Sequence, residues 1–356
     1  VFVAFGTANA WLLARVLAHA GVPWRACYAA ALVFALSPAV VYVHGWTGTL
    51  ADLLTLSFLL LAARLIQRDT PVSAVGAAWL VALALLSKES AIVLPALLLF
   101  VAYGRPASRS TPLAVALSTA VVVAYLAFRL PILADSAAAD PAYAWSLRNL
   151  VPRAIEYLLY PFTPPLFEIS PLLDASIARL AAAAICVMLL LYALGTRGPR
   201  WPLGWLVAYL AALAPVLVLP VAYDQYAYLA SALAIAIPAA AWPELRRTPR
   251  AILVILAAIV VAHGAAVMAR MVRAGVIERN LHADLVEAVR SDPAASIVVT
   301  ADSRDRWLLG RLLHDVPSYR GVPLLNVHAA ENGESAPGAL RLHMNRDGHL
   351  VPISGP

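Results

Sequence analysis

The sequence predicts an all-α membrane protein, in which a bundle of about ten membrane-spanning helices is followed by a small α/β domain. Three observations predict this fold class. Hydrophobic residues make up 62% of the 356 residues and charged residues only 13%, whereas soluble domains are nearer half apolar and a quarter charged. The mean hydropathy is +0.79. Long apolar runs also alternate with short polar loops along most of the chain.

Each apolar run approaches the roughly 20 residues that a membrane-spanning helix needs, or is shorter where neighbouring helices would bury it. The expected helices cover residues 1–19, 26–43, 49–66, 72–87, 90–104, 111–130, 177–196, 202–220, 225–242 and 250–272. Together they form a predicted transmembrane domain over residues 1–272.

Arginine clusters mark every second loop, which the positive-inside rule assigns to the cytoplasm. These clusters are Arg15 and Arg25, Arg64 and Arg68, Arg105 and Arg109, Arg197 and Arg200, and Arg246, Arg247 and Arg250. The net charge of +6 is therefore explained without a nucleic-acid partner. The loops expected on the outer side are 43–52, 87–90, 131–176 and 222–226, together with the chain after about residue 273.

The stretch "LLSKESAIVLP", residues 85–95, places Lys88 and Glu89 inside an apolar run. Residues 72–104 are too few for two full spans and too many for one, and arginines flank both ends. We expect a helical hairpin that turns at Ser87–Ser90 near the outer face. The alternative is one long helix kinked at Pro95, with the charged pair at its centre.

The long loop 131–176 is expected to contain an amphipathic helix that lies on the membrane surface. The segment "WSLRNLVPRAIEYLLYPF" predicts it. Its apolar side would carry Leu147, Leu150, Ile155, Leu158 and Leu159, with Arg148, Arg153 and Glu156 on the opposite side. Cys27 and Cys186 lie in apolar segments, so no disulfide framework is indicated.

Residues 273–356 have ordinary charge density and predict a small extracytoplasmic α/β domain. Helices are expected in "VIERNLHADLVEAVR" and "RDRWLLGRLLHD", and short strands in "ASIVVTAD" and "VPLLNVH". No nucleotide-binding glycine loop and no zinc-ligand spacing occurs in the sequence.

Ionisable groups within membrane segments are costly and often functional. Lys88 is a point charge suited to a phosphate, and Glu89 would hold it in place or act on a hydroxyl. The alternative is a self-satisfied ion pair at a helix turn. Arg129 ends a helix on the outer side, against the positive-inside trend, and is a second candidate for an anionic head group.

Two further outer boundaries carry candidate residues. "SPAVVYVHGWTGTLADLL" contains His44 and Asp52 around a Gly-rich turn, although Asp52 could simply cap the following helix. "PVAYDQYAYLAS" contains Asp224, Gln225, Tyr226 and Tyr228, which could bind sugar hydroxyls or form part of an aromatic belt.

Three segments resemble the GT-C superfamily of membrane glycosyltransferases, in the branch of protein O-mannosyltransferases and tetratricopeptide-bearing transmembrane O-mannosyltransferases. They are "ALVFALSPAVVYVHGWTGTLADLLTLSFLLLAARL", "ALALLSKESAIVLPALLL" and "YDQYAYLASALAIA". The second matches the family's "LLSKE" turn almost letter for letter, and the order of the three also agrees. The resemblance covers roughly residues 1–245.

The resemblance implies a GT-C-like helical bundle with its active site on the outer face. The donor would be a polyprenyl-phosphate sugar, with mannose or a related hexose as the sugar, and the acceptor a protein, glycan or lipid. Lys88 and Arg129 would contact the donor phosphate, and Glu89 would orient Lys88. Asp52 and Glu89 are the catalytic candidates, and His44, Asp224, Gln225, Tyr226 and Tyr228 would line the sugar or acceptor side.

The family's general base is an acid in the first outer loop, which is expected to precede Val1, because no Asp or Glu occurs before Asp52. The sequence also departs from the family pattern at Ser37-Pro38, where the family often has His-Pro. "GTLAD" lacks a family arginine, and "YAYLAS" replaces "YLYLPS". These departures bear on the acceptor more than on the donor.

The leading hypothesis is therefore a polyprenyl-phosphate-dependent glycosyltransferase of the bacterial inner or plasma membrane. No cofactor is indicated by a motif, and a divalent metal requirement stays open. Two alternatives remain: a transporter or flippase for a lipid-linked or anionic solute, which also places charges at broken helices, and a catalytically inactive membrane scaffold.

Overall fold

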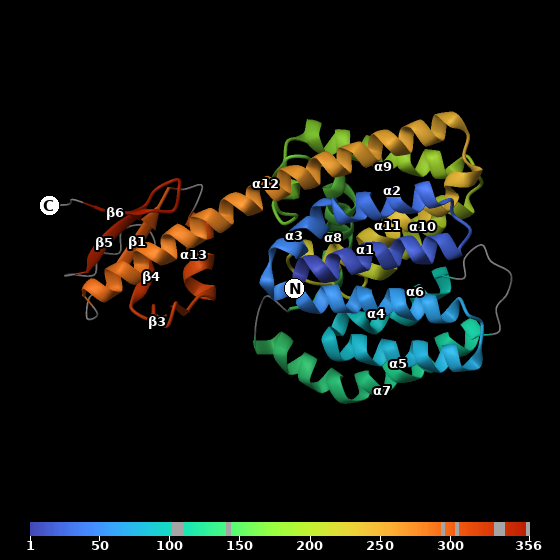
Figure 1. The fold of residues 1–356 in the computed structure, drawn as a ribbon, viewed down its shortest axis with the longest axis horizontal. Helices are drawn as coiled ribbons and strands as arrows, with labels where there is room; N and C mark the ends of the chain where they lie inside the picture. Colours follow the sequence, from blue (N-terminus) through green and yellow to red (C-terminus); the bar gives the residue numbers. More distant parts are fainter. Residues whose placement is uncertain (102–109, 140–143, 293–295, 303–305, 331–338, 354–356) are drawn as a thin grey trace. The chain divides into compact units, whose positions relative to one another are not determined.

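The computed structural model describes residues 1–101, 110–139, 144–292, 296–302, 306–330 and 339–353 (Figure 1). It divides into two compact units, Val1–Met268 and Ala269–Pro356, whereas the sequence places the domain boundary between residues 272 and 273. Residues 102–104 of one expected helix, and the loop arginines Arg105 and Arg109, lie outside the described residues.

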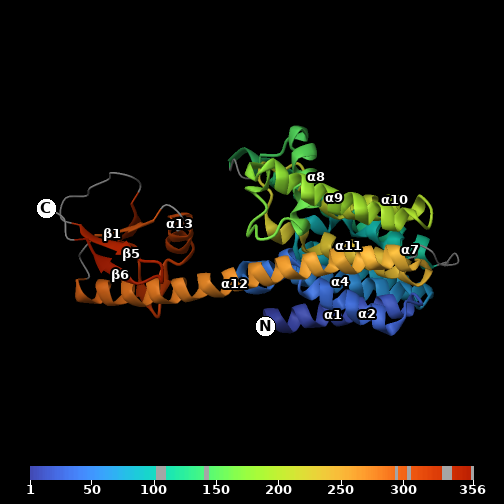
Figure 2. The same ribbon diagram turned by 90° about the horizontal axis from the view of Figure 1, so that it is seen from above.

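In the first unit, each segment where the sequence predicts a helix contains a helix, although some of these helices are shorter than predicted or broken. Its α-helices are α1 (Phe2–His19), α2 (Trp24–Ala35), α3 (Pro38–Gly45), α4 (Leu50–Ile66), α5 (Pro71–Ser87), α6 (Leu94–Val101), α7 (Ser110–Ala139), α8 (Leu150–Leu159), α9 (Ile177–Gly195), α10 (Arg200–Leu213), α11 (Ala227–Ala241) and the first part of α12 (Arg247–Ser291). Short 3-10 turns join several of them: η1 (Thr47–Thr49), η2 (Glu89–Val93), η4 (Leu147–Asn149), η5 (Tyr160–Phe162), η6 (Leu172–Asp174), η7 (Asp224–Tyr226) and η8 (Trp242–Glu244). In Figure 2, α11 lies between α9 and α10 on one side and α1 and α2 on the other.

Fewer helices than the predicted ten are long and apolar enough to cross a membrane. Within the described residues four qualify, in the segments Ser110–Ile132, Ile177–Gly195, Asp224–Glu244 and Arg247–Ser291, and a fifth if α2 and α3 together form one bent span. The remaining helices are too short or too polar to qualify alone. The structure therefore supports a membrane protein, and it does not support a count of ten spans.

The expected helix 26–43 is broken into α2 and α3, which are bent by 58°. Pro38 explains the break, because a proline disfavours the helical conformation of the residue before it. Ser37 accordingly has φ −71° and ψ 150°. A different property of proline accounts for the end of α10 at Leu213 rather than at the predicted residue 220. Ala214 still has helical angles, but the following Pro215 has no N–H to continue the helical hydrogen bonds, and its ring crowds the preceding turn.

The hairpin prediction for residues 72–104 is confirmed by contacts at both of its ends. Ser110, which begins α7, donates a backbone hydrogen bond to Asp69 just before α5. Glu89, which follows α5, forms an ion pair with Arg129 near the other end of α7. The chain therefore passes from one end of the bundle to the other along α5 and is back at the first end by Ser110, which one long kinked helix could not achieve.

Arginines gather at one end of the first unit. Figure 1 shows the α1–α2, α4–α5, α9–α10 and α11–α12 connections at that end. We call it the arginine-rich end, and the opposite end, which holds η1, the turn at Lys88 and η7, the site end. The arginines in or beside these connections are Arg25, Arg64, Arg68, Arg197, Arg200, Arg246, Arg247 and Arg250.

The second unit is an α/β fold with its own apolar core. Its four-stranded sheet has the order β4 (Val327–Ala329), β1 (Ile297–Ala301), β5 (Leu340–Met344) and β6 (Leu350–Pro352), and β2 (Ser318–Tyr319) pairs with β3 (Val322–Pro323). Strand β1 runs parallel to β4 and β5, and β6 is antiparallel to β5. The helix α13 (Arg306–Asp315) lies in the predicted segment, whereas the expected strand 322–328 is split between β3 and β4. The predicted helix 276–290 is the continuation of α12.

Candidate functional site

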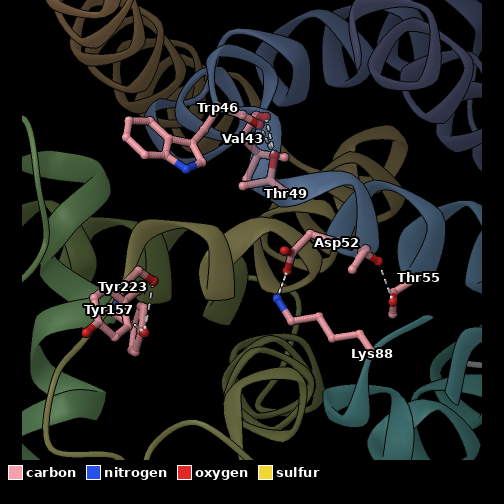
Figure 3. A network of polar contacts seen from close by, with 9 residues as sticks. Val43, Trp46, Thr49, Asp52, Thr55, Lys88, Tyr157 and Tyr223 are labelled. Atoms are coloured by element: carbon pink, nitrogen blue, oxygen red, sulfur yellow. Dashed lines mark hydrogen bonds and ion pairs between the residues drawn. The ribbon is translucent and has the colours of Figure 1, made fainter. Parts of the chain in front are cut away.

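Lys88 forms an ion pair with Asp52 at the site end of the bundle (Figure 3). Asp52 lies in the first turn of α4, and Lys88 is the residue that follows the last turn of α5. Their side chains are 10% and 15% exposed. Both charges are therefore largely removed from solvent but remain close to the bundle surface.

The local structure before α4 aims Asp52 at this position. The buried Thr49 hydroxyl lies 2.6 Å from the carbonyl oxygens of both Val43 and Trp46 and closes the turn between α3 and α4 (Figure 3). Because Asp52 comes only three residues later, the same turn fixes the direction of its carboxylate. A first-turn acid also interacts favourably with the helix dipole.

Tyr226 lies on another side of the Lys88 ammonium. The lysine nitrogen is 4.8 Å from the centre of the Tyr226 ring, a cation–π distance. A carboxylate and an aromatic ring thus contact one ammonium, and they come from α4 and η7. Asp52, Lys88 and Tyr226 each belong to a different one of the three segments that resemble the glycosyltransferase family. The structure therefore brings all three segments together at the Lys88 ammonium.

Glu89 and Arg129 form a second ion pair beside the first, at 2.7 Å. This pair is more exposed, with 47% and 36% of the two side chains accessible. Arg129 is therefore close to the turn that carries Lys88. A second ligand of the same phosphate would need to lie there.

Glu89 does not orient Lys88, because the two side chains have different partners. Lys88 has an extended backbone, with φ −157° and ψ 134°, and successive side chains of an extended segment point to opposite faces. Lys88 therefore reaches Asp52 while Glu89 reaches Arg129. The alternative of a self-satisfied pair between the two neighbours is excluded for the same reason.

A small pocket borders the Lys88 contacts. It encloses about 10 Å³, and its lining contains Asp52, Thr55, Ser90 and Tyr226, together with apolar side chains in and just after α10 and in α11. The pocket thus combines a carboxylate, hydroxyls and an aromatic ring, which are groups that bind sugar hydroxyls and faces. Arg129 and Asp224 are not among its lining residues.

Asp224 lies in the same 3-10 turn as Tyr226 but its side chain is buried, with 4% exposed. It lies within hydrogen-bonding reach of the Tyr160 hydroxyl, and its Oδ1 is buried without a hydrogen-bond partner among the described residues. Gln225 between them is half-buried. Asp224 therefore faces α8 and η5 rather than Lys88.

The turn that carries Asp224 and Tyr226 is held by Tyr157 of α8. The Tyr157 hydroxyl donates to the Tyr223 carbonyl at 3.1 Å and accepts from the Tyr223 amide at 3.2 Å (Figure 3). Tyr209 of α10 in turn donates to the Tyr157 carbonyl at 2.7 Å. Neither tyrosine stands out in the sequence, because both lie in segments that read as aromatic and apolar.

Tyr228 lies deeper than a sugar-contacting role requires, and His44 beside it is half-buried. Tyr228 is 0% exposed, and its ring is 6.1 Å from that of His44. The His44 ring packs against Gly6, where an added Cβ would come within 2.1 Å of its Nε2. The geometry therefore favours a packing role for both residues.

A buried polar network that the sequence analysis did not identify lies beneath the Asp52 contact. Asn9 is 0% exposed and donates to the Leu53 carbonyl at 2.9 Å and to the Tyr228 hydroxyl at 3.1 Å. Ser57 donates to the Asn9 Oδ1 at 2.6 Å. An asparagine inside an apolar helix was the available signal, since such residues bind neighbouring helices through interhelical hydrogen bonds.

The helix α8 differs in part from the predicted surface helix, because it also buries a residue of the predicted polar side. Glu156 is 1% exposed and packs inward, whereas Leu147, before α8, and Val151 are 72% and 66% exposed. Arg153 pairs with Glu156 at 2.6 Å. The predicted polar side of the helix is thus partly the side that faces the protein. Of the predicted apolar side, Leu147 and Ile155 are exposed, whereas Leu150, Leu158 and Leu159 are partly buried against the core.

The burial of Glu156 predicts a pH-dependent stability. Burial raises the pKa of this carboxyl to about 7, an effect that Arg153 partly opposes and Asp174 reinforces. Between the ordinary pKa of 4.5 and about 7, the unfolded chain has released the proton that the folded chain still binds, so stability falls as pH rises through this window.

Glu156→Gln should therefore remove a downward step in the unfolding midpoint between pH 4.5 and 7, measured by thermal unfolding in mild detergent. The matched control is Glu244→Gln, which changes a 40% exposed carboxylate paired with Arg197 and should leave the profile unchanged. Identical pH profiles for Glu156→Gln and the unmodified protein would contradict the assignment.

Lys88 is also chemically distinctive within the chain. Of the 26 lysines and arginines, it is the single lysine. An ammonium is a compact charge with three donors, whereas a guanidinium is a planar fork. The one position with an ammonium is thus the position held between Asp52 and Tyr226.

No family model, curated protein or solved structure matches the chain. Within the described ranges, no group of three or more His, Cys, Asp or Glu side chains is arranged to hold a metal ion. The functional conclusion therefore depends on the geometry of the site and on the sequence resemblance alone.

Proposed function

We propose that the protein is a membrane glycosyltransferase that transfers mannose or a related hexose from a polyprenyl-phosphate donor to a protein, glycan or lipid acceptor. The observation that carries this proposal is the convergence of Asp52, Lys88, Glu89 and Arg129, from three segments, at one end of an apolar bundle. Charged residues in such a place are costly and tend to be functional.

The donor chemistry calls for a cation at the edge of the membrane. In the transfer, the bond between the sugar's anomeric carbon and the phosphate oxygen breaks, and polyprenyl phosphate leaves with the bonding electron pair. A fixed positive charge near that oxygen stabilises the charge that develops in the transition state. Lys88 is the proposed ligand of this oxygen, and Arg129 would assist at the more exposed side.

An acidic group must accept the proton of the attacking acceptor hydroxyl. Asp52 and Glu89 are the two candidates that the described residues offer beside the cations. Thr55, Ser90 and Tyr226 would contact the sugar after the donor widens their pocket, which encloses about 10 Å³ and has room for about one water molecule. Gln225 would lie on the acceptor side, next to the buried Asp224. A bound phosphate would share Lys88 with Asp52 or displace it.

The proposed orientation places the arginine-rich end in the cytoplasm, following the positive-inside rule, and the site end and the second unit outside. In this proposal the shorter helices α1, α4, α5, α6 and α10 also cross the bilayer, wholly or in part, because their neighbours in the bundle cover them. Together with the bent pair α2–α3 and the four longer helices, this would give ten spans.

The decisive test uses the full chain reconstituted in liposomes that contain polyprenyl-phosphate mannose labelled in the sugar. Membrane proteins and glycans of the source cell serve as acceptors. We expect protein-dependent release of free polyprenyl phosphate together with label on a non-lipid product. Intact donor after prolonged incubation with each hexose donor tested would overturn the proposal.

A transporter or flippase is the second candidate, and the break between α2 and α3 favours it, because transporters bind their solutes at discontinuous helices. The same liposomes distinguish the two functions. A flippase would move the labelled lipid to the opposite leaflet with its sugar attached, measured by its protection from an impermeant oxidant. An inactive scaffold would produce neither result.

A further inference from the structure

An apolar groove lies between α2, α11 and α12 of the first unit, away from the Lys88 site. It encloses about 350 Å³, within the range of ligand-binding pockets. Its walls combine larger apolar side chains with several small ones, including Ala29, Ala30, Ala234 and Ala257. Small residues allow membrane helices to pack closely, yet here they leave an open channel.

The groove is long enough to cover most of one membrane leaflet. Its lining on α2 extends from Arg25 to Val33, and on α12 from Leu253 to Val260. At 1.5 Å per helical residue, these distances are about 12 and 10 Å. The hydrocarbon core is about 30 Å thick, so the groove covers most of one leaflet, beginning at the arginine-rich end.

The mouth of the groove is cationic and aromatic. Arg25 is exposed at the first turn of α2, and no acidic partner of Arg25 occurs among the described residues. Trp242 lines the same end, and the Arg250 guanidinium lies 5.4 Å from its ring. Tryptophans occur where membrane helices meet lipid head groups.

We propose that this groove binds one anionic phospholipid of the leaflet at the arginine-rich end, with an acyl chain between α2, α11 and α12 and the phosphate against Arg25. Basic pockets between membrane helices recognise anionic head groups through charge. An acyl chain matches the apolar lining and its length. The proposal does not depend on the glycosyltransferase assignment, because it uses none of the residues of the Lys88 site.

The test measures lipid binding to the purified full chain by native mass spectrometry, with phosphatidylglycerol and phosphatidylcholine of equal chain length. The unmodified protein should prefer phosphatidylglycerol by about fivefold or more, which is the effect of roughly one arginine near the surface. Arg25→Gln should abolish that preference. Arg68→Gln, an exposed arginine at the same end but outside the groove, is the matched control and should retain it.

A second variant tests the acyl-chain position independently of charge. Ala29→Phe should fill the groove and remove bound lipid of both kinds, and Ala29→Leu serves if the larger side chain prevents folding. Equal binding of the two lipids by the unmodified protein would overturn the proposal. So would unchanged lipid retention in a folded Ala29 variant, or a dimer in which a second copy excludes lipid.

Discussion

Lys88→Met is expected to reduce sugar transfer by roughly 100- to 1,000-fold, the usual effect of removing one group that stabilises developing charge. In the proposed mechanism the ammonium balances the charge of the leaving phosphate, and no other lysine occurs in the chain. The same change should weaken the binding of free polyprenyl phosphate at least tenfold. Both quantities are measurable with the reconstituted protein, the second by titration without any acceptor.

The single substitution has a structural consequence that a second variant removes. Lys88→Met leaves the Asp52 carboxylate buried without its partner, which costs about 3–5 kcal/mol when a buried pair is broken on one side. The double variant Asp52→Asn with Lys88→Met removes both charges and should fold normally. It should still bind polyprenyl phosphate weakly if Lys88 contacts the phosphate.

Asp52→Asn alone completes the comparison. It leaves Lys88 charged and free of its carboxylate, so the affinity for polyprenyl phosphate should stay the same or increase, whatever happens to turnover. Wild-type phosphate affinity in the folded double variant would show that Lys88 serves only to neutralise Asp52. Lys88→Arg should retain part of the affinity, because the charge remains but the planar guanidinium differs in shape from an ammonium.

The sequence predicted the position of the Lys88 turn but not the partners of its charges. Residues 72–104 were too few for two full spans and too many for one, so the sequence left a hairpin and one long kinked helix as alternatives. The contacts of Ser110 and Glu89 agree with the hairpin. Adjacency in sequence suggested that Lys88 and Glu89 act together. One extended residue at the turn reverses that conclusion, and backbone conformation at a single position cannot be derived from composition.

The helical segments were predictable because long apolar runs leave few alternatives for a buried backbone. The sequence could not predict which of these segments span the membrane, because that depends on how far neighbouring helices cover the short or polar ones. The break at Ser37 had a visible signal in Pro38. The Asn9–Ser57 hydrogen bond joins residues 48 positions apart, and nothing in the local pattern of either helix specifies that pairing.

Gly264→Ala is expected to be the most destabilising small substitution in the first unit. A Cβ at Gly264 would lie 1.7 Å from the Leu36 carbonyl oxygen and 2.8 Å from its carbon, and both are backbone atoms that cannot rotate away. Overpacking of this kind typically costs 1–3 kcal/mol and sometimes more. We expect the unfolding midpoint in mild detergent to fall by roughly 2–12 °C, given about 2–4 °C per kcal/mol for a unit of this size.

Two other glycines give matched controls. Gly275 lies in the same helix with nothing within 4 Å of an added Cβ, and at Gly195 the nearest atom is a Pro202 side-chain carbon at 3.9 Å. Gly275→Ala should be neutral or stabilising by about 1 kcal/mol, because alanine favours the helix more than glycine does. If the unfolding midpoint of Gly264→Ala equals those of the control variants, α12 can move away from the Leu36 backbone at little cost in stability.

The position of Gly264 connects this stability prediction with the site. Leu36 lies at the break between α2 and α3, and α3 leads directly into the turn that Thr49 closes before Asp52. A side chain that pushes α12 away from the break would therefore shift α3 and, with it, the carboxylate that contacts Lys88. We expect Gly264→Ala to reduce the rate of sugar transfer even at temperatures at which the variant is folded, whereas the Gly275→Ala and Gly195→Ala variants should retain full activity. The difference between these rates measures how far the site depends on the close approach of the α12 backbone to Leu36.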